Sequence, residues 1–100
     1  MSATALLANQ LTTEHGFADW TVRIEPWRGP DLPVYAGRVF LSHRLFSFSA
    51  WLDTQPEWLQ RDTILHEIAH ALLGHDEHDD GWRAAARRYG CTLSDWWPRD

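Results

Sequence analysis

The sequence predicts one α+β domain, and three observations carry this prediction. The chain has 100 residues, of which 13% are aromatic and seven are Trp, so it holds enough apolar area for one core without disulfide staples. Helical periodicity near its start is followed by alternating, strand-like stretches. Two further helical stretches complete the chain, which gives the element order of an α+β fold. We therefore expect a single domain over residues 1–100.

The first half of the chain is expected to form one helix and two extended segments. Leucines recur at helical spacing within residues 2–15, and Gly16 ends that pattern. Residues 20–24 alternate apolar and polar side chains, as a half-buried strand does. Residues 26–33 hold three prolines and a glycine, which predicts a connecting loop. A second extended segment covers residues 34–42.

Two features of the middle of the chain leave their structure open. Gly37, inside the second extended segment, marks either a bulge or a break into two shorter strands. Residues 45–52 are rich in aromatic side chains and fit either the end of a strand or a helix.

The strongest helical pattern covers residues 56–73. Asp53 or Thr54 can cap its N-terminus, and Pro56 is tolerated in its first turn. Gly74 ends it. A polar loop and a last amphipathic helix follow.

The last helix is expected over residues 81–89, after a polar loop at 75–80 and before Gly90. Trp82 shares a face with Tyr89 and the alanines between them. We therefore interpret Trp82 as a core residue, packed behind the histidines described below, rather than as a group that stacks on a substrate. The Tyr89 hydroxyl could stabilise an oxyanion, although no feature of the sequence places it near a metal.

Composition excludes several classes of protein. Nine basic and 14 acidic residues give a net charge of −5, which argues against a broad basic surface for nucleic acid. No apolar run approaches the roughly 20 residues that span a bilayer, and no basic region precedes the first apolar residues as in a secretory signal. The only cysteine, Cys91, cannot form a disulfide within the chain, which fits a reducing compartment. We expect a soluble, cytoplasmic protein without a membrane partner.

Two histidines in the strongest predicted helix carry the chemistry. His66 and His70 are four residues apart, so they lie about one turn apart on one face and can converge on one ion. Zinc binds imidazole nitrogen at about 2.0–2.1 Å, and a catalytic zinc keeps three protein ligands and one position for water. The metal lowers the pKa of that water toward about 7, and Glu67, beside the first ligand, can accept its proton. The pattern predicts zinc-dependent peptide hydrolysis with Glu67 as general base.

A surface helix with two histidines is the alternative interpretation, because His-Glu-x-x-His also occurs by chance. The surrounding residues favour the metal site. Leu65, Ile68 and Leu72 provide an apolar face that is separate from the histidines. Thr63, one turn before the first histidine, is small enough to leave room beside the ligands.

The third ligand is chosen between two histidines that follow the helix. The longer pattern with glycine at position 73 and histidine at 76 is excluded, because Leu73 and Asp76 stand there. His75 would point about 140° away from His70 on a continued helix. His78 lies in the loop beyond the helix end and can return toward the ligand face. We therefore favour His78 over His75 as the third zinc ligand.

The acidic residues of the same loop have two interpretations. A carboxylate could accept a hydrogen bond from the outer nitrogen of a ligand histidine. The other interpretation is a solvated loop in which Asp79 or Asp80 caps the last helix. We favour the second interpretation for at least three of the four residues, which are Asp76, Glu77, Asp79 and Asp80.

Two stretches resemble the core of SprT-like zinc metallopeptidase domains. They are residues 63–72, Thr-Ile-Leu-His-Glu-Ile-Ala-His-Ala-Leu, and residues 78–83, His-Asp-Asp-Gly-Trp-Arg. In that family a third histidine precedes a tryptophan or another bulky aromatic residue by four positions, which matches His78 and Trp82. The resemblance covers most of residues 5–91.

The resemblance implies a minimal zincin-like fold, with an N-terminal helix, a short sheet packed on the metal-bearing helix, and a C-terminal helix. It implies a Zn²⁺ ion held by His66, His70 and His78, with Glu67 as the catalytic residue. It also implies a protein or peptide substrate, which could add as a further strand along the segment near residues 39–41.

Two other functions remain open. The first is a metal-stabilised interaction module without turnover, since 100 residues leave little room for substrate recognition. A fourth protein ligand, such as Asp76 or His75, would favour that function. The second is the repair of protein–DNA crosslinks, as in Spartan-type relatives. This chain lacks the cysteines of their zinc ribbon and a basic tail, so nucleic acid is a partner that its charge does not support.

Overall fold

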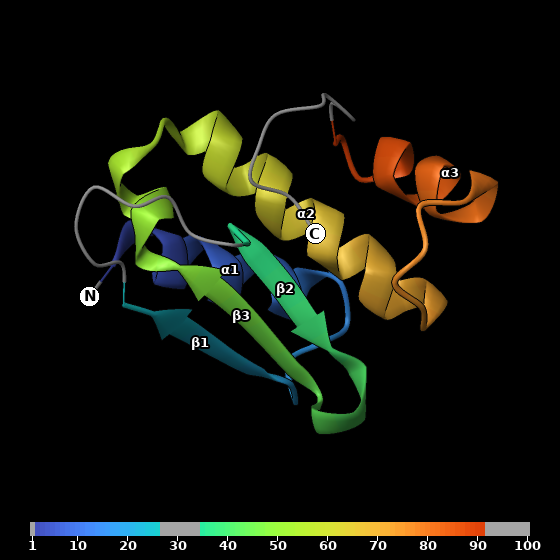
Figure 1. The fold of residues 1–100 in the computed structure, drawn as a ribbon, viewed down its shortest axis with the longest axis horizontal. Coiled ribbons are helices and arrows are strands. Elements are labelled where there is room, and N and C mark those ends of the chain that lie inside the picture. Colours follow the sequence, from blue (N-terminus) through green and yellow to red (C-terminus); the bar gives the residue numbers. More distant parts are fainter. Residues whose placement is uncertain (1, 27–34, 92–100) are drawn as a thin grey trace.

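The structure, a computed structural model, describes residues 2–26 and 35–91 and confirms the α+β class (Figure 1). Its elements are α1 (Ala3–Glu14), β1 (Thr21–Glu25), β2 (Gly37–Phe40), the 3₁₀ helix η1 (Leu41–His43), β3 (Leu45–Ser49), the 3₁₀ helix η2 (Ala50–Thr54), α2 (Glu57–Leu73) and α3 (Asp80–Arg88). Among the described helices, none is long and apolar enough to cross a membrane. Apart from Pro26, the proline-rich loop expected at 26–33 lies outside the described residues.

The three strands form one sheet in the order β1-β3-β2. β3 pairs in parallel with β1 and antiparallel with β2, so the central strand is the last of the three in sequence. Phe46 and Phe48 of β3 are fully buried and lie on one face of the sheet, with near-parallel rings 6.4 Å apart. Residues 45–52, which the sequence left open, therefore divide into a strand and a 3₁₀ helix.

The helix α2 is the centre of the fold and contacts α1, α3 and β2. Figure 1 shows α1 behind the sheet and α2 alongside β2. Every α2 residue from 62 to 70 is buried, because other elements cover the helix on several sides. The apolar face expected in the sequence is correct for Leu65 and Ile68, but Leu72 is 47% exposed. Burial in the middle of α2 therefore includes its polar residues.

The N-terminal caps differ from the sequence prediction at one helix. Ser2 caps α1, and its hydroxyl accepts a hydrogen bond from Ala5 N–H. The expectation that Asp53 or Thr54 caps α2 is wrong, since the cap position is Pro56 and makes no side-chain hydrogen bond. Asp53 instead accepts a hydrogen bond from Thr4 N–H at 2.9 Å and so serves the start of α1.

Of the two alternatives for Gly37, a bulge or a break, the bulge is contradicted, because β2 begins at this residue and its register is continuous. The register is continuous from Gly37, opposite Phe48, to Phe40, opposite Leu45. A Cβ atom at position 37 would lie 2.8 Å from Cδ1 of Phe48 and 3.0 Å from Cγ2 of Thr63. Glycine is needed here because α2 and the ring of Phe48 approach the strand closely.

Candidate metal centre

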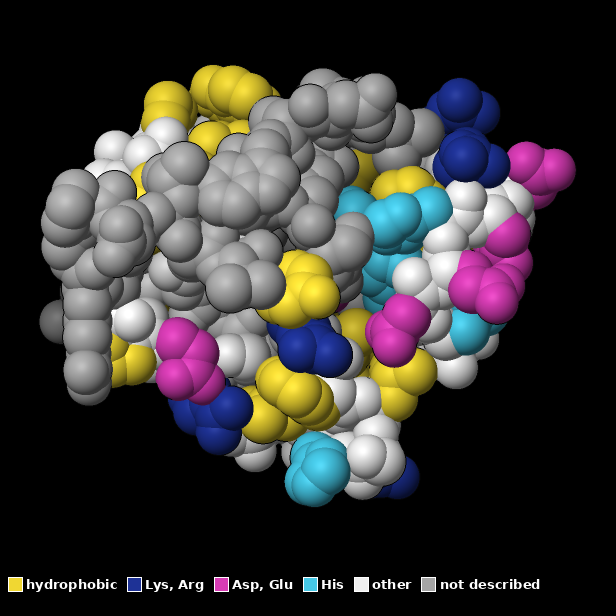
Figure 2. Space-filling model, viewed as in Figure 1, with side chains coloured by type: hydrophobic (Ala, Val, Ile, Leu, Met, Phe, Trp, Pro, Cys, Tyr) yellow, Lys and Arg dark blue, Asp and Glu magenta, His cyan; other side chains and the backbone are white. Residues whose placement is uncertain are grey.

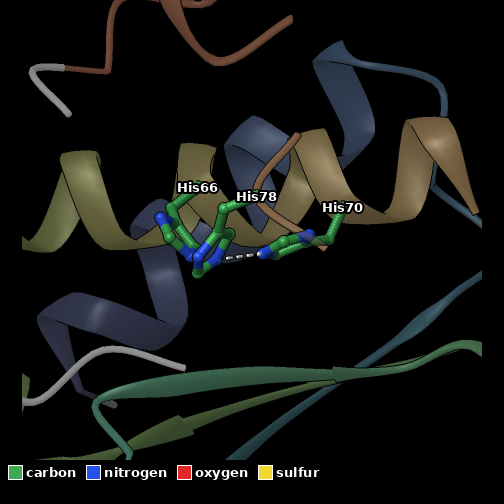
Figure 3. A group of neighbouring side chains, drawn as sticks. All are labelled: His66, His70 and His78. Atoms are coloured by element: carbon green, nitrogen blue, oxygen red, sulfur yellow. Dashed lines mark hydrogen bonds between the residues drawn. The ribbon is translucent and has the colours of Figure 1, made fainter. Parts of the chain in front are cut away.

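Three histidines from two segments come together on one side of α2. His66 and His70 project from the helix, and His78 reaches them from the loop that precedes α3 (Figure 3). One nitrogen of each ring lies within 4.8 Å of the others. His66 and His70 are buried, whereas His78 is exposed. The structure therefore brings together the three residues that the sequence favoured as ligands, and leaves the group accessible from solvent.

The spacing of His70 and His78 is close to that of two ligands of one divalent metal ion. The Nε2 atoms of His70 and His78 are 3.0 Å apart. Two nitrogens that bind one tetrahedral ion at about 2.0–2.1 Å would be separated by about 3.3 Å. A set of three imidazoles leaves one coordination position for water or substrate, as in catalytic sites. The donor set is therefore suitable for an ion that must remain accessible.

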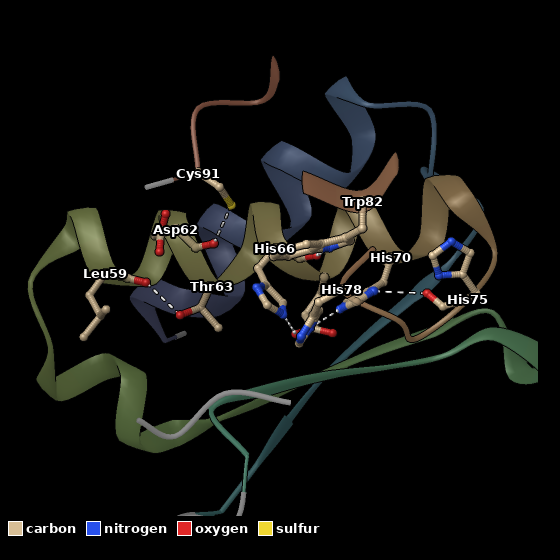
Figure 4. Close-up of polar contacts among 10 residues, drawn as sticks. Leu59, Asp62, Thr63, His66, His70, His75, His78, Trp82 and Cys91 are labelled. Carbon is tan, nitrogen blue, oxygen red and sulfur yellow. Dashed lines mark hydrogen bonds and ion pairs between the residues drawn. The ribbon is translucent and has the colours of Figure 1, made fainter. Parts of the chain in front are cut away.

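A backbone carbonyl group fixes the orientation of His70. Nδ1 of His70 lies 3.0 Å from the carbonyl oxygen of His75 (Figure 4). A carbonyl oxygen can only accept, so Nδ1 carries the hydrogen and Nε2 keeps the lone pair that a metal needs. The group that accepts the hydrogen bond from the outer nitrogen of His70 is therefore the backbone carbonyl of His75, and not a carboxylate of the acidic loop.

Trp82 of α3 packs against all three imidazoles. Its ring centroid lies 4.7 Å from that of His66, 5.2 Å from that of His70 and 4.5 Å from that of His78. The indole N–H donates to the carbonyl oxygen of His66 at 3.4 Å, and the residue is 4% exposed. The prediction that Trp82 belongs to the core behind the ligands is confirmed.

Glu67 is buried beside the histidines. It is 1% exposed, and its Oε2 atom lies 3.7 Å from Nε2 of His66. The carboxylate is thus close to the ring of one of the three converging histidines. A group in this place can hydrogen-bond a water molecule on the metal and accept a proton from it.

The other candidate residues take different roles. The ring of His75 faces the backbone N–H of Glu77 and the carboxylate of Asp79, so it is separate from the histidine cluster. Asp79 caps α3 by accepting a hydrogen bond from Trp82 N–H at 2.9 Å, as predicted for Asp79 or Asp80. The ring of Tyr89 packs against His15, with centroids 4.4 Å apart.

A shallow cleft follows the free side of β2 beside the acidic loop. It has a volume of about 360 Å³ and is lined by Arg38, Val39, Phe40, Leu41, Ser42, His43 and Asp76. Figure 2 shows this face, with histidine side chains at the surface beside acidic, basic and hydrophobic ones. Apolar β2 and η1 side chains therefore meet a carboxylate from the loop that carries His78.

One contact of the centre could not be found from the sequence. Any residue supplies a backbone carbonyl group, so nothing in the residue type of His75 indicated that its oxygen would meet His70. The relevant signal is Gly74, whose left-handed backbone (φ 74°, ψ 24°) reverses the chain immediately after α2. That reversal returns the next carbonyl group toward the helix.

Comparison with known proteins supports the architecture. No family model matches the chain, and no curated protein matches its sequence. The fold is similar to the crystal structure of the metallopeptidase zymogen of Pyrococcus abyssi abylysin, with a TM-score of 0.67 and 17% sequence identity. The similarity covers 85% of this chain and 77% of that chain. The likeness concerns the α+β fold, which is compatible with a minimal zincin-like arrangement, while membership of the SprT-like family stays a prediction.

Proposed function

We propose that this protein is a zinc-dependent metallopeptidase of the SprT-like kind. The observation that carries the proposal is the convergence of His66, His70 and His78 beside the buried carboxylate of Glu67. Three neutral nitrogen ligands with an adjacent general base are the equipment of metal-assisted peptide hydrolysis. The likeness of the fold to a metallopeptidase zymogen adds support.

The roles of the residues follow from their positions. A bound zinc ion would polarise both a water molecule and the peptide carbonyl group. Glu67 would take the proton of that water and later deliver it to the departing amine. Trp82 would keep the three imidazoles in place by its ring contacts, and the exposed side of His78 would admit substrate.

The β2 edge provides a place for an extended peptide. The carbonyl group of Ala36 accepts a hydrogen bond from Ser49 N–H, so the backbone groups of alternate residues point toward β3. Gly37 and Val39 therefore direct their N–H and C=O groups to the opposite side. No strand of the described residues pairs with that side of β2. A peptide that adds there as a further strand would lie along the cleft, beside Asp76 of the loop that also carries His78.

The test is a comparison of Glu67→Gln with the native protein. Glutamine has the same shape but cannot act as a base, so the variant should bind zinc and lose peptidase activity by about 100-fold or more. Metal content is measured by elemental analysis, and cleavage by mass spectrometry on a library of unstructured peptides. Glu77→Gln, in the exposed loop, is the matched control and should remain active.

Each result decides between functions. Cleavage by Glu67→Gln at the native rate would refute the role of this residue. A native protein that holds zinc but cleaves no peptide in the library would favour the metal-stabilised interaction module instead. Activity that requires DNA and falls with salt would favour the crosslink-repair function.

A further inference from the structure

His75 is the residue through which the loop after α2 is held in place. We propose that His75, which is not a ligand, is a positioning residue of the metal centre. Its side chain fixes the loop so that its own carbonyl group orients His70 and His78 reaches the ion. The inference deepens the proposed function and rests on the three-histidine site.

The backbone of His75 acts on the second ligand directly. Its carbonyl oxygen meets Nδ1 of His70 at 3.0 Å, immediately after the reversal at Gly74. The reversal itself is closed by Gly74 N–H, which donates to the carbonyl oxygen of His70 at 2.9 Å. The orientation of the His70 ring thus depends on where the peptide group of residue 75 is held.

The imidazole of His75 makes two contacts that hold residue 75 in place. Its Nδ1 atom accepts a hydrogen bond from Glu77 N–H at 3.2 Å, and Nε2 lies 3.3 Å from Oδ2 of Asp79. A backbone N–H can only donate, so Nδ1 is the acceptor and the Nε2 hydrogen is directed at the carboxylate. The other oxygen of Asp79 caps α3 through Trp82 N–H. One side chain therefore connects the loop to the start of α3.

These contacts fix the residues on both sides of the third ligand in the sequence. His78 stands between Glu77 and Asp79, the two residues that the His75 ring binds. Without the ring, the segment between the two helices would sample more conformations, and zinc binding would have to order it. The expected consequence is weaker binding of the ion, although all three ligands are still present.

The first test measures zinc affinity by competition with a chromogenic chelator. His75→Ala should weaken zinc binding about tenfold, in the range usual for groups that orient metal ligands. His75→Asn should be intermediate, because its side-chain oxygen can still accept from Glu77 N–H. Glu77→Ala is the matched control, since residue 77 enters the network through its backbone, and it should bind zinc like the native protein.

A second variant removes the same contact from its other partner. Asp79→Ser keeps a side-chain oxygen that can cap α3 but cannot span the distance to His75. It should weaken zinc binding by a similar factor to His75→Ala. The double variant should be little weaker than either single variant, because both remove one interaction. Additive losses would overturn the proposed connection between the two residues.

The third readout needs no metal. Long-range ¹H–¹⁵N spectra of the zinc-free native protein should show His70 protonated at Nδ1, and His75→Ala should show a mixture of the two tautomers. Thermal unfolding of each zinc-free variant identifies any that fails to fold. If His75→Ala does not fold, zinc affinity and the His70 tautomer are measured on His75→Asn instead. Native zinc affinity and an unchanged His70 tautomer in His75→Ala would overturn the inference. A native protein that binds no zinc would refute the proposed function, while the tautomer would still decide the role of His75.

Discussion

The Nε2 atoms of His70 and His78 face each other at 3.0 Å. Since Nδ1 of His70 donates to the carbonyl oxygen of His75, Nε2 of His70 is an acceptor and Nε2 of His78 must supply the hydrogen. The hydrogen bond between the two rings and a shared metal ion are therefore alternatives. To hold an ion between these two atoms, the His78 ring would carry its hydrogen on Nδ1 instead of Nε2, and both Nε2 lone pairs would then face the ion.

Zinc should stabilise the fold through this group. A ligand at 100 times its dissociation constant contributes about 2.7 kcal/mol, and for a chain of this size each kcal/mol shifts the Tm by about 4–8 °C. We expect the Tm to fall by roughly 10–20 °C when a chelator removes the metal. His78→Ala should melt at the same temperature with and without zinc, whereas His43→Ala, a histidine on η1, should respond like the native protein. A zinc-dependent rise of the Tm as large in His78→Ala as in the native protein would exclude His78 as a ligand.

Gly37→Ala should destabilise the protein. The added methyl group would meet Cδ1 of Phe48 at 2.8 Å and Cγ2 of Thr63 at 3.0 Å, and overpacking of this kind costs about 1–3 kcal/mol. Urea unfolding measures the change. Gly81→Ala is the control, because its Cβ atom would lie at ordinary contact distance, 3.4 Å, from the carboxylate of Asp79 and alanine favours a helix. If both variants unfold at the native midpoint, the close packing of β2 against α2 is incorrect.

Asp53→Ala should lower stability through a helix to which it does not belong. Its carboxylate accepts the backbone N–H of Thr4 at the positive end of α1, and loss of such a cap costs about 1 kcal/mol. Asp53→Asn keeps an acceptor and should lose less. The free energy of unfolding in urea is the measurement. Thr54→Ala, at the other residue expected to cap α2, should change this free energy by less than about 0.5 kcal/mol. A larger loss in Thr54→Ala than in Asp53→Ala would support the original expectation that Thr54 caps α2.

Trp82→Ala should affect both the core and the metal centre. Truncation of a buried aromatic side chain costs about 3–5 kcal/mol, and the three imidazoles would lose the ring against which they pack. Trp82→Phe should retain most of the zinc affinity, since a ring remains. Trp58→Ala is the matched control, because Trp58 is 57% exposed on α2 and its loss should be nearly neutral. Equal stability of the two alanine variants would contradict the packing described.

The sequence was sufficient for features that depend on neighbours along the chain. The spacing of four places His66 and His70 on one face of α2 because helical geometry is local. Gly74 ends that helix for a similarly local reason, as its left-handed backbone is easily adopted by glycine. The order of the elements follows from the same kind of pattern except at residues 45–52, where strand and helix stayed alternatives. The cap of α3 was likewise narrowed to Asp79 or Asp80, and the structure selects Asp79.

The tertiary structure decided the contacts between distant segments. Asp53 caps α1 from 49 residues away, and Gly37 is required by an aromatic ring and a helix that the strand meets only after folding. The position of the His78 ring and the use of the His75 carbonyl group depend on a loop whose course is set by packing and hydrogen bonds. Short-range geometry repeats in every helix and can be read from spacing. The free energy that selects one loop conformation is a sum over the whole fold, and it exists only once the helices and the sheet are assembled.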